Sequence, residues 1–153
     1  MGSNCLISCR ECFYMREFRI GIGMLYSPEA LKDLDSKYAL LPDLIKSEET
    51  LAHIRELLEE KNADIADGYG HRIYRCPNCG EFQENFYLRL DYDGGSYEVP
   101  YNCPECGAPL ELVDLNTGGS GWGEVEPLDI KKYPCPQCGK HGLQYSEGGI
   151  LWD

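Results

Sequence analysis

Eight of the nine cysteines in this 153-residue chain form four pairs, each pair separated by two residues. Two cysteines at this spacing on a tight turn can direct both sulfurs at one ion, and two such turns complete a tetrahedron of thiolates around Zn²⁺. We therefore predict two structural zinc ions, each held by four of the paired cysteines, which are Cys9, Cys12, Cys76, Cys79, Cys103, Cys106, Cys135 and Cys138.

Three of the four pairs share the longer pattern Cys-Pro-x-Cys-Gly, which ends at Gly80, Gly107 and Gly139. A glycine after the second cysteine lets the chain adopt a left-handed conformation. The proline after the first cysteine fixes its own φ and restricts its neighbour, which stiffens the turn. This triple occurrence makes metal binding the strongest prediction that the sequence supports.

The sequence leaves two ways of joining the pairs. One joins the second pair to the third across 23 residues, and the first pair to the fourth. The other joins the first pair to the second, and the third to the fourth. Their loop-closure entropies differ by only about 0.4 kcal/mol, which is too little to choose between them. A hairpin expected between the second and third pairs favours the first scheme.

The amino-terminal pair departs most from the pattern, because Phe13 stands where the other pairs have glycine. Cys5 lies four positions before Cys9, and His141 follows Cys138 by three positions, so both are possible substitute ligands. We expect Cys9 and Cys12 to be the ligands and Cys5 to lie outside both sites.

Two helices are expected between the first and second cysteine pairs. Ser27 followed by Pro28 is typical of a helix start, and Ser47 followed by two glutamates marks a second one. Pro42 separates the two helices, and Asn62 is a suitable end for the second. One face of the second helix carries apolar residues at helical spacing, namely Leu51, Ile54, Leu57 and Leu58.

From His71 onward the pattern is that of strands. Apolar and polar residues alternate over 86–92, a glycine-rich turn follows at 93–95, and alternation resumes from Tyr97 to Tyr101. A second hairpin is expected near the end, where residues 147–149 separate Leu143 and Tyr145 from Ile150 and Trp152. Residues 116–123 are glycine-rich and predict a loop. Trp122 within it either anchors a partner or packs on its own domain.

These elements predict an α+β protein in which zinc-ribbon β-hairpins carry a helical insertion. We expect an N-terminal knuckle and strand over residues 1–26, which completes the second metal site, and a helical insertion over 27–68. A zinc ribbon over 69–114 and a glycine-rich loop with a C-terminal knuckle and hairpin over 115–153 follow. Metal binding would replace the large apolar core that small β-modules lack.

The three Cys-Pro-x-Cys-Gly segments resemble the knuckles of zinc ribbons and rubredoxins. The wider layout resembles a group of small, uncharacterised bacterial zinc-ribbon proteins. In that group an early Cys-x-x-Cys precedes a strand similar to residues 21–26, helices follow, and further knuckles lead to an end similar to residues 150–153. The resemblance implies the fold over most of the chain and implies no activity. Phe13 departs from the group's first knuckle.

The charge of the chain restricts its partners. The formal net charge is −12, and two zinc ions each held by four thiolates would bring it to about −16. Such a surface repels phosphate backbones, so nucleic acid is disfavoured. The longest apolar stretch, residues 20–26, is too short to span a bilayer. Without a signal-like amino terminus, we expect a cytoplasmic protein whose paired cysteines bind metal.

Three functions are compatible with this pattern. A closed four-cysteine zinc site leaves no position for substrate, which favours a non-enzymatic module that binds another protein. Tetrahedral sulfur also accepts iron, which would make a rubredoxin-like electron carrier. A nucleic-acid-associated ribbon would need a basic patch, for which Arg72, Arg75 and Arg89 are the nearest candidates. The sequence specifies neither a substrate, a partner nor an oligomeric state.

Overall fold

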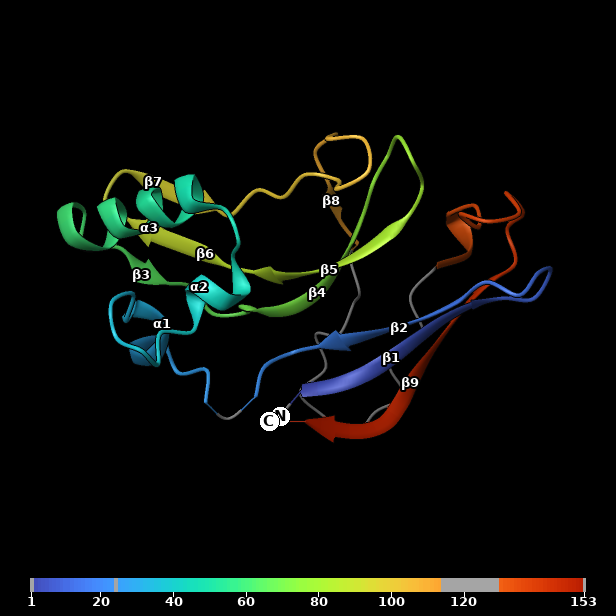
Figure 1. Cartoon of the computed structure of the whole chain (residues 1–153), viewed down its shortest axis with the longest axis horizontal. Coiled ribbons are helices and arrows are strands. Elements are labelled where there is room, and N and C mark those ends of the chain that lie inside the picture. The colour runs from blue at the N-terminus through green and yellow to red at the C-terminus, as the bar shows by residue number, and fades with distance from the viewer. Residues whose placement is uncertain (1, 24, 114–129, 153) are drawn as a thin grey trace.

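The computed structural model describes residues 2–23, 25–113 and 130–152. Within these residues the chain forms three short helices and three antiparallel sheets of three strands each, a mixed composition that agrees with the α+β class. The molecule is elongated, with the helices at one end (Figure 1). None of the helices formed by these residues has the length and apolar character needed to cross a membrane.

The first sheet joins the two ends of the chain. Its strands are β2 (Met15–Ile20), β1 (Gly2–Cys9) and β9 (Leu143–Trp152), in that order, so β1 pairs with both neighbours. The second hairpin predicted near the chain end is wrong, because β9 continues through 147–149 as one strand. The long partner β1 overrides the turn signal, and the register shift between Ser3 and Cys5 absorbs the extra residues.

The second sheet has the order β5–β4–β8, with β4 (Gly70–Arg75) between β5 (Phe82–Tyr87) and β8 (Glu111–Leu112). The strand that the resemblance implied over 21–26 lies earlier in the chain, as β2. That strand ends before Gly21, whose φ is 87°, and Gly21 then bridges to His71 of β4. This bridge links the first sheet to the second.

The third sheet has the order β3–β6–β7, with strands β3 (Asp64–Ile65), β6 (Arg89–Tyr92) and β7 (Gly95–Glu98). The hairpin predicted around residues 93–95 is confirmed as β6–β7, and Gly94 takes a φ of 101° in its turn. The alternation predicted over 86–92 is also confirmed, since Phe86, Leu88 and Leu90 are buried. The chain there forms two strands rather than one, because β5 pairs with β4 and β6 pairs with β7.

Both predicted helix starts are confirmed. Ser27 caps α1 (Pro28–Lys32) and Ser47 caps α3 (Glu48–Glu60), each accepting a hydrogen bond from a backbone N–H three residues later. Pro42 lies in a further short helix, α2 (Leu41–Leu44), where the first turn tolerates proline. Asn62 follows α3 with a φ of 50°, in the left-handed region.

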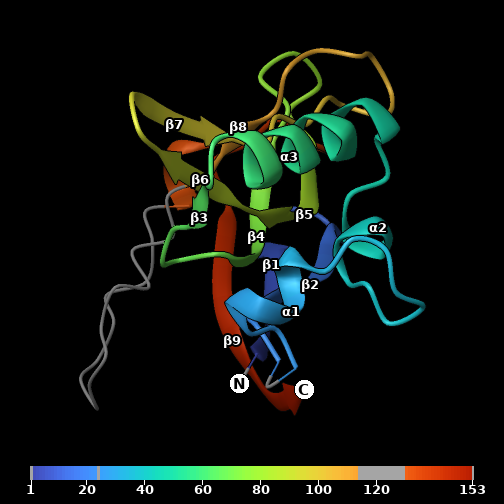
Figure 2. The ribbon, with the colours of Figure 1, turned by 90° about the vertical axis from the view of Figure 1, so that its left-hand side faces the viewer.

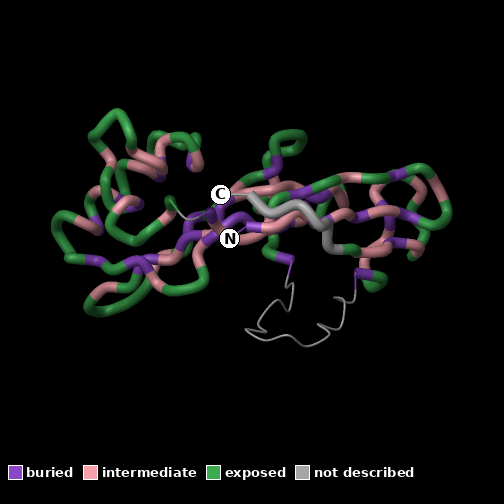
Figure 3. The backbone as a smooth tube through the Cα atoms, turned by 90° about the horizontal axis from the view of Figure 1, so that it is seen from below, coloured by how far each residue is buried: buried purple, intermediate pink, exposed green. Residues whose placement is uncertain are grey.

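Two apolar cores lie along the molecule. The first packs β1, β2, β4 and β9 around residues such as Ile7, Phe18 and Leu143. The second packs Ile54 and Leu57 of α3 against the chain from Phe86 to Leu90; Figure 2 shows α3 lying across β6. Figure 3 shows buried stretches through the interior of the molecule and exposed segments in many of its outer turns. The loop predicted over 116–123, with Trp122, lies outside the described residues.

Candidate metal centres

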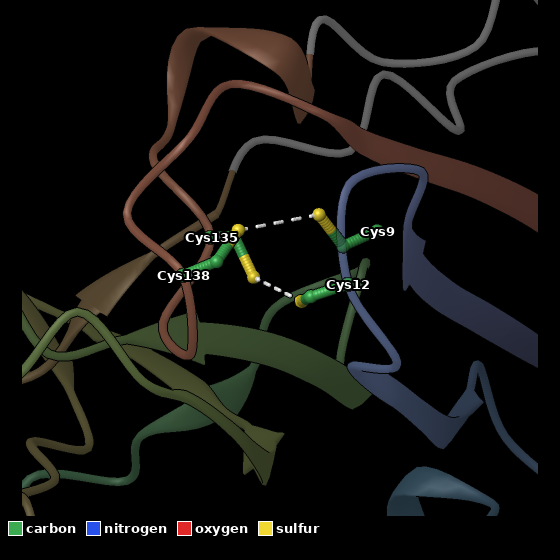
Figure 4. A group of neighbouring side chains, drawn as sticks. All are labelled: Cys9, Cys12, Cys135 and Cys138. Atoms are coloured by element: carbon green, nitrogen blue, oxygen red, sulfur yellow. Dashed lines mark hydrogen bonds between the residues drawn. The ribbon is translucent and has the colours of Figure 1, made fainter.

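The structure brings the paired cysteines together in two groups of four. Cys9, the last residue of β1, and Cys12, in the turn before β2, meet Cys135 and Cys138. The latter pair lies between the short 3₁₀ helix η1 (Ile130–Lys132) and β9. We call this group the terminal tetrad (Figure 4). The second group, the central tetrad, joins the pair between β4 and β5 to the pair that precedes β8, and its members are Cys76, Cys79, Cys103 and Cys106.

This grouping follows the scheme that the expected hairpin favoured. In each tetrad the four sulfur atoms all lie within 4.8 Å of one another. The geometry is the reason: β1–β9 pairing brings the chain ends together, and β4–β8 pairing brings the second and third cysteine pairs together. Each tetrad therefore depends on strand pairing between distant segments.

The three Cys-Pro-x-Cys-Gly turns share one backbone geometry. In the turn that begins at Cys76, the N–H of Gly80 donates to the Cys76 carbonyl at 2.8 Å, and the N–H of Cys76 donates to the Glu81 carbonyl at 2.9 Å. The turns that begin at Cys103 and Cys135 repeat both bonds. The glycine φ angles are 78°, 76° and 75° for Gly80, Gly107 and Gly139.

The amino-terminal turn closes differently. The N–H of Cys9 donates to the Tyr14 carbonyl at 3.0 Å, which matches the outer bond of the other turns. In this described turn, the N–H of Phe13 makes no hydrogen bond to the Cys9 carbonyl, the bond that the glycine N–H makes in the other turns. Phe13 does not take a positive φ. Phe13 is instead fully exposed. The departure seen in the sequence therefore changes the turn without preventing its two sulfurs from joining the tetrad.

Sulfur separations suit a tetrahedral ion. The Sγ atoms of Cys9 and Cys138 lie 3.7 Å apart, and those of Cys12 and Cys135 lie 3.6 Å apart. Tetrahedral zinc with Zn–S bonds near 2.3 Å requires S···S separations of about 3.8 Å. These separations are far longer than a disulfide bond, and none of the nine cysteines forms one.

Backbone amides point at the sulfurs as well. The N–H of Glu11 lies 3.4 Å from the Cys9 sulfur, and the N–H of Tyr14 lies 3.4 Å from the Cys12 sulfur. In the central tetrad the N–H of Cys79 donates to the Cys76 sulfur at 3.2 Å. Such amides favour a thiolate over a thiol because they stabilise its negative charge.

The thiols of the terminal tetrad ionise unequally. Burial opposes ionisation of Cys9, but the Glu11 amide and the Cys138 thiol outweigh it and lower the pKa of Cys9 to about 7. The Tyr14 amide acts to lower the pKa of Cys12, but burial and the neighbouring thiols outweigh it and raise that pKa.

The central tetrad shows the same contrast. The Asn78 side chain and the Ala108 amide lower the pKa of Cys106 to about 6, whereas contact with Cys106, together with burial, raises the pKa of Cys79. Charge on one sulfur opposes charge on the next, so full ionisation of either tetrad requires a cation among the sulfurs.

The substitute ligands considered from the sequence lie elsewhere. Cys5 is buried in β1 and belongs to neither tetrad. His141 is exposed, and its Nδ1 lies 2.8 Å from the Lys131 carbonyl oxygen. The tetrads thus consist of cysteine alone.

The three arginines considered for nucleic acid each contact another group of the chain. The guanidinium of Arg72 stacks over Tyr87 and donates to the Gly68 carbonyl at 2.7 Å. Arg75 lies over the ring of Tyr133, and Arg89 pairs with Asp91 at 3.1 Å. Each arginine is engaged by a neighbour within the chain.

Sequence reasoning did not anticipate a hollow of about 760 Å³ between α3 and the chain around β7. Glu49, His53 and Glu56 line its helical side, and Tyr97 and Tyr101 line the other. The ring of His53 meets that of Tyr97 edge-on, with centroids 4.5 Å apart. The spacing of Glu49, His53 and Glu56 along one helical face could have indicated this surface, but its tyrosine wall depends on tertiary packing.

Comparisons of this chain with protein-family models, with curated proteins and with solved structures found no match.

Proposed function

We propose that this protein binds two zinc ions, one in each tetrad, and that it serves as a non-enzymatic protein-interaction module. The convergence of eight sulfurs in two fours, at separations suited to a tetrahedral ion, carries this proposal. Four thiolates complete the coordination of zinc, so neither site offers a position for substrate. When bound, the ion cross-links its two turns, and its binding free energy becomes folding free energy.

In this proposal the central tetrad and the strands that carry it form a zinc ribbon. Its first turn connects β4 to β5, and its second turn leads into β8, which pairs with β4. In the first sheet, zinc bound at the terminal tetrad would likewise cross-link the β1–β2 turn to the segment before β9. The helical end packs around a separate core that contains no tetrad cysteine, so it remains available for contact with a partner.

Metal identity is the first test. Protein purified from its native source should be colourless and carry two zinc ions per chain, measured by native mass spectrometry and elemental analysis. Replacing Cys103 with serine should remove one ion, and replacing Cys135 with serine should remove the other. A coloured protein containing iron with a reversible one-electron couple would instead support the rubredoxin-like electron carrier, since tetrahedral sulfur accepts either metal.

The hollow between α3 and β7 supports the interaction role and indicates the kind of partner. Its lining contains two glutamates and two tyrosines, and contains no lysine or arginine. The chain as a whole has a net charge of −12. A lysine or arginine side chain would find carboxylates for its charge and aromatic faces for its stem and head. We infer that the hollow receives a basic segment of a partner protein.

Binding of short lysine- and arginine-containing peptides to the zinc-loaded protein tests this inference. Amide protection on binding should appear in α3 and β7, and affinity should fall as salt increases. The paired variant Glu49→Gln/Glu56→Gln should weaken binding several-fold. Glu59→Gln/Glu60→Gln makes the same charge change on the same helix, outside the lining residues, and should leave binding nearly unchanged. Equal losses in both variants, or protection elsewhere, would rule out this surface.

A further inference from the structure

The two tetrads have the same ligands but differ in their access to solvent. In the terminal tetrad Cys9 and Cys135 are buried, and Cys12 and Cys138 are half-buried. In the central tetrad Cys76 and Cys103 are also buried, but the second cysteines of the two pairs, Cys79 and Cys106, are exposed. In each pair that forms the central tetrad the second cysteine is therefore an exposed residue.

The packing around the tetrads explains this difference. Cys9 and Cys135 belong to the first apolar core, and Cys12 and Cys138 pack against it. No cysteine of the central tetrad belongs to either apolar core. Among the described residues, the central tetrad therefore lies outside the apolar packing that surrounds the terminal tetrad.

The four sulfurs of the central tetrad also lie close enough to react with one another. The Sγ atoms of Cys76 and Cys106 are 3.5 Å apart, and those of all four cysteines lie within 4.8 Å of one another. A small shift would bring two of them to bonding distance, because a disulfide requires about 2.05 Å between sulfurs. An oxidant that modifies one sulfur therefore leaves a second sulfur beside it.

We propose that the central tetrad is a site of reversible oxidation, at which peroxide oxidises Cys79 or Cys106 and zinc is released, while the terminal tetrad keeps its ion. The proposal rests on the proposed zinc binding. Thiolate oxidation depends on exposure as well as on ionisation. Since both tetrads present the same ligands to the same metal, exposure decides which one reacts first.

The reaction balances with hydrogen peroxide as the oxidant. A thiolate attacks one peroxide oxygen, the O–O bond breaks, and hydroxide leaves with the formation of a sulfenic acid. A neighbouring thiolate then attacks that sulfur, forms the S–S bond and displaces a second hydroxide. Two thiolates are oxidised, one peroxide is reduced, and two protons convert the hydroxides to water. Zinc has lost two of its ligands and dissociates, and a dithiol reductant reverses the change.

The experiment exposes the fully zinc-loaded wild-type chain to stoichiometric hydrogen peroxide. Released zinc is followed with a chromophoric chelator, and native mass spectrometry counts the ions that remain bound. Cysteines are then alkylated and located by peptide mapping, which assigns the reacted tetrad without any substitution. We expect one ion to leave several-fold faster than the other, together with a disulfide that contains Cys79 or Cys106. Reductant and added zinc should restore the two-zinc form.

Each result decides the proposal. Release of both ions at one rate, or first release from the terminal tetrad, would overturn it. Loss of the central ion without a disulfide, through over-oxidation to sulfinic acid, would also overturn it because that change is not reversed by thiols. A chain that never carried two zinc ions would refute the proposed zinc binding instead, and the initial mass spectrum distinguishes that case.

Discussion

The phenol of Tyr14 donates a hydrogen bond of 2.7 Å to the carboxylate of Glu81, and this contact joins a turn of each tetrad. The carbonyl of Tyr14 closes the turn that begins at Cys9, and the carbonyl of Glu81 closes the turn that begins at Cys76. The two side chains therefore start from equivalent positions of the two turns. Burial, with the hydrogen bond and charge of Glu81 adding to it, raises the pKa of Tyr14. The tetrads are linked directly by this pair.

Removing the link should lower stability without removing metal. Tyr14 is 7% exposed and its acceptor is a carboxylate, so Tyr14→Phe should lower the free energy of unfolding of the zinc-loaded protein by about 1–2 kcal/mol. Urea denaturation measures this loss, and native mass spectrometry checks that two ions remain.

A double-mutant cycle with Glu81→Gln measures the interaction energy between the two side chains apart from the other effects of each substitution. The control is Tyr38→Phe, since Tyr38 is 75% exposed. The link would be unimportant if Tyr14→Phe matched this control. Loss of an ion from the variant would show that Tyr14 stabilises the metal site itself and does not act by linking the two tetrads.

The positive φ of the turn glycines gives a second prediction. Gly107 has a φ of 76°, and a Cβ there would meet no atom within 4 Å. Gly107→Ala therefore adds only the cost of a left-handed alanine, about 1–2 kcal/mol, which denaturant titration of the zinc-loaded protein would detect.

Phe13 occupies the equivalent position of the amino-terminal turn and supplies the matched control. It does not take a positive φ and is fully exposed. Phe13→Ala should thus change the free energy of unfolding by less than about 0.5 kcal/mol. Equal effects at the two positions would contradict the difference in backbone geometry between the turns.

Chelation of the metal should unfold the molecule unevenly. Cys9 and Cys135 are part of the first apolar core, whereas the second core contains no tetrad cysteine. After verified removal of both ions, amide protection should be lost in β1, β4, β5 and β9, and α3 should retain more of its protection. Hydrogen exchange measured residue by residue tests this order. Unchanged exchange and circular dichroism would show that the metal does not maintain this fold.

Sequence patterns predicted local features well in this chain. Ser27 and Ser47 identified both helix starts because N-capping depends on neighbours three residues apart. The alternation from Phe86 to Leu90 identified the buried face because side-chain direction in a strand has a period of two. Cysteine spacing likewise identified the turns that form the tetrads, since each turn is built within six residues.

Pairing between distant segments was less accessible from sequence. Gly148 and Gly149 have turn composition, yet β9 runs through them because β1 pairs with β9 on both sides of the two glycines. The hollow beside α3 was missed for the same reason, since Tyr97 reaches His53 only through packing of β7 against the helix. The difference in exposure between the tetrads also depends on which apolar core each one meets.

His71 should make stability depend on pH. Its side chain is 5% exposed in β4, with Nδ1 lying 3.4 Å from a carboxylate oxygen of Glu84 on β5. Burial lowers the pKa of His71, the charge of Arg19 on β2 lowers it further, and Glu84 opposes both. The unfolded chain therefore binds a proton on this residue at higher pH than the folded chain does. As pH falls below about 6.5, the unfolded state gains protons first, so the free energy of unfolding decreases.

Replacing His71 with glutamine removes this titrating group and should reduce the loss of stability between about pH 7.5 and about pH 5.5. The measurement is urea denaturation of zinc-loaded wild type and variant at both pH values. His53→Gln serves as the control, because the side chain of His53 is 45% exposed. Any acid weakening of the thiolate sites is common to all three proteins, so the comparison isolates the imidazole. Parallel losses in wild type and His71→Gln would show that burial of His71 does not couple proton binding to folding.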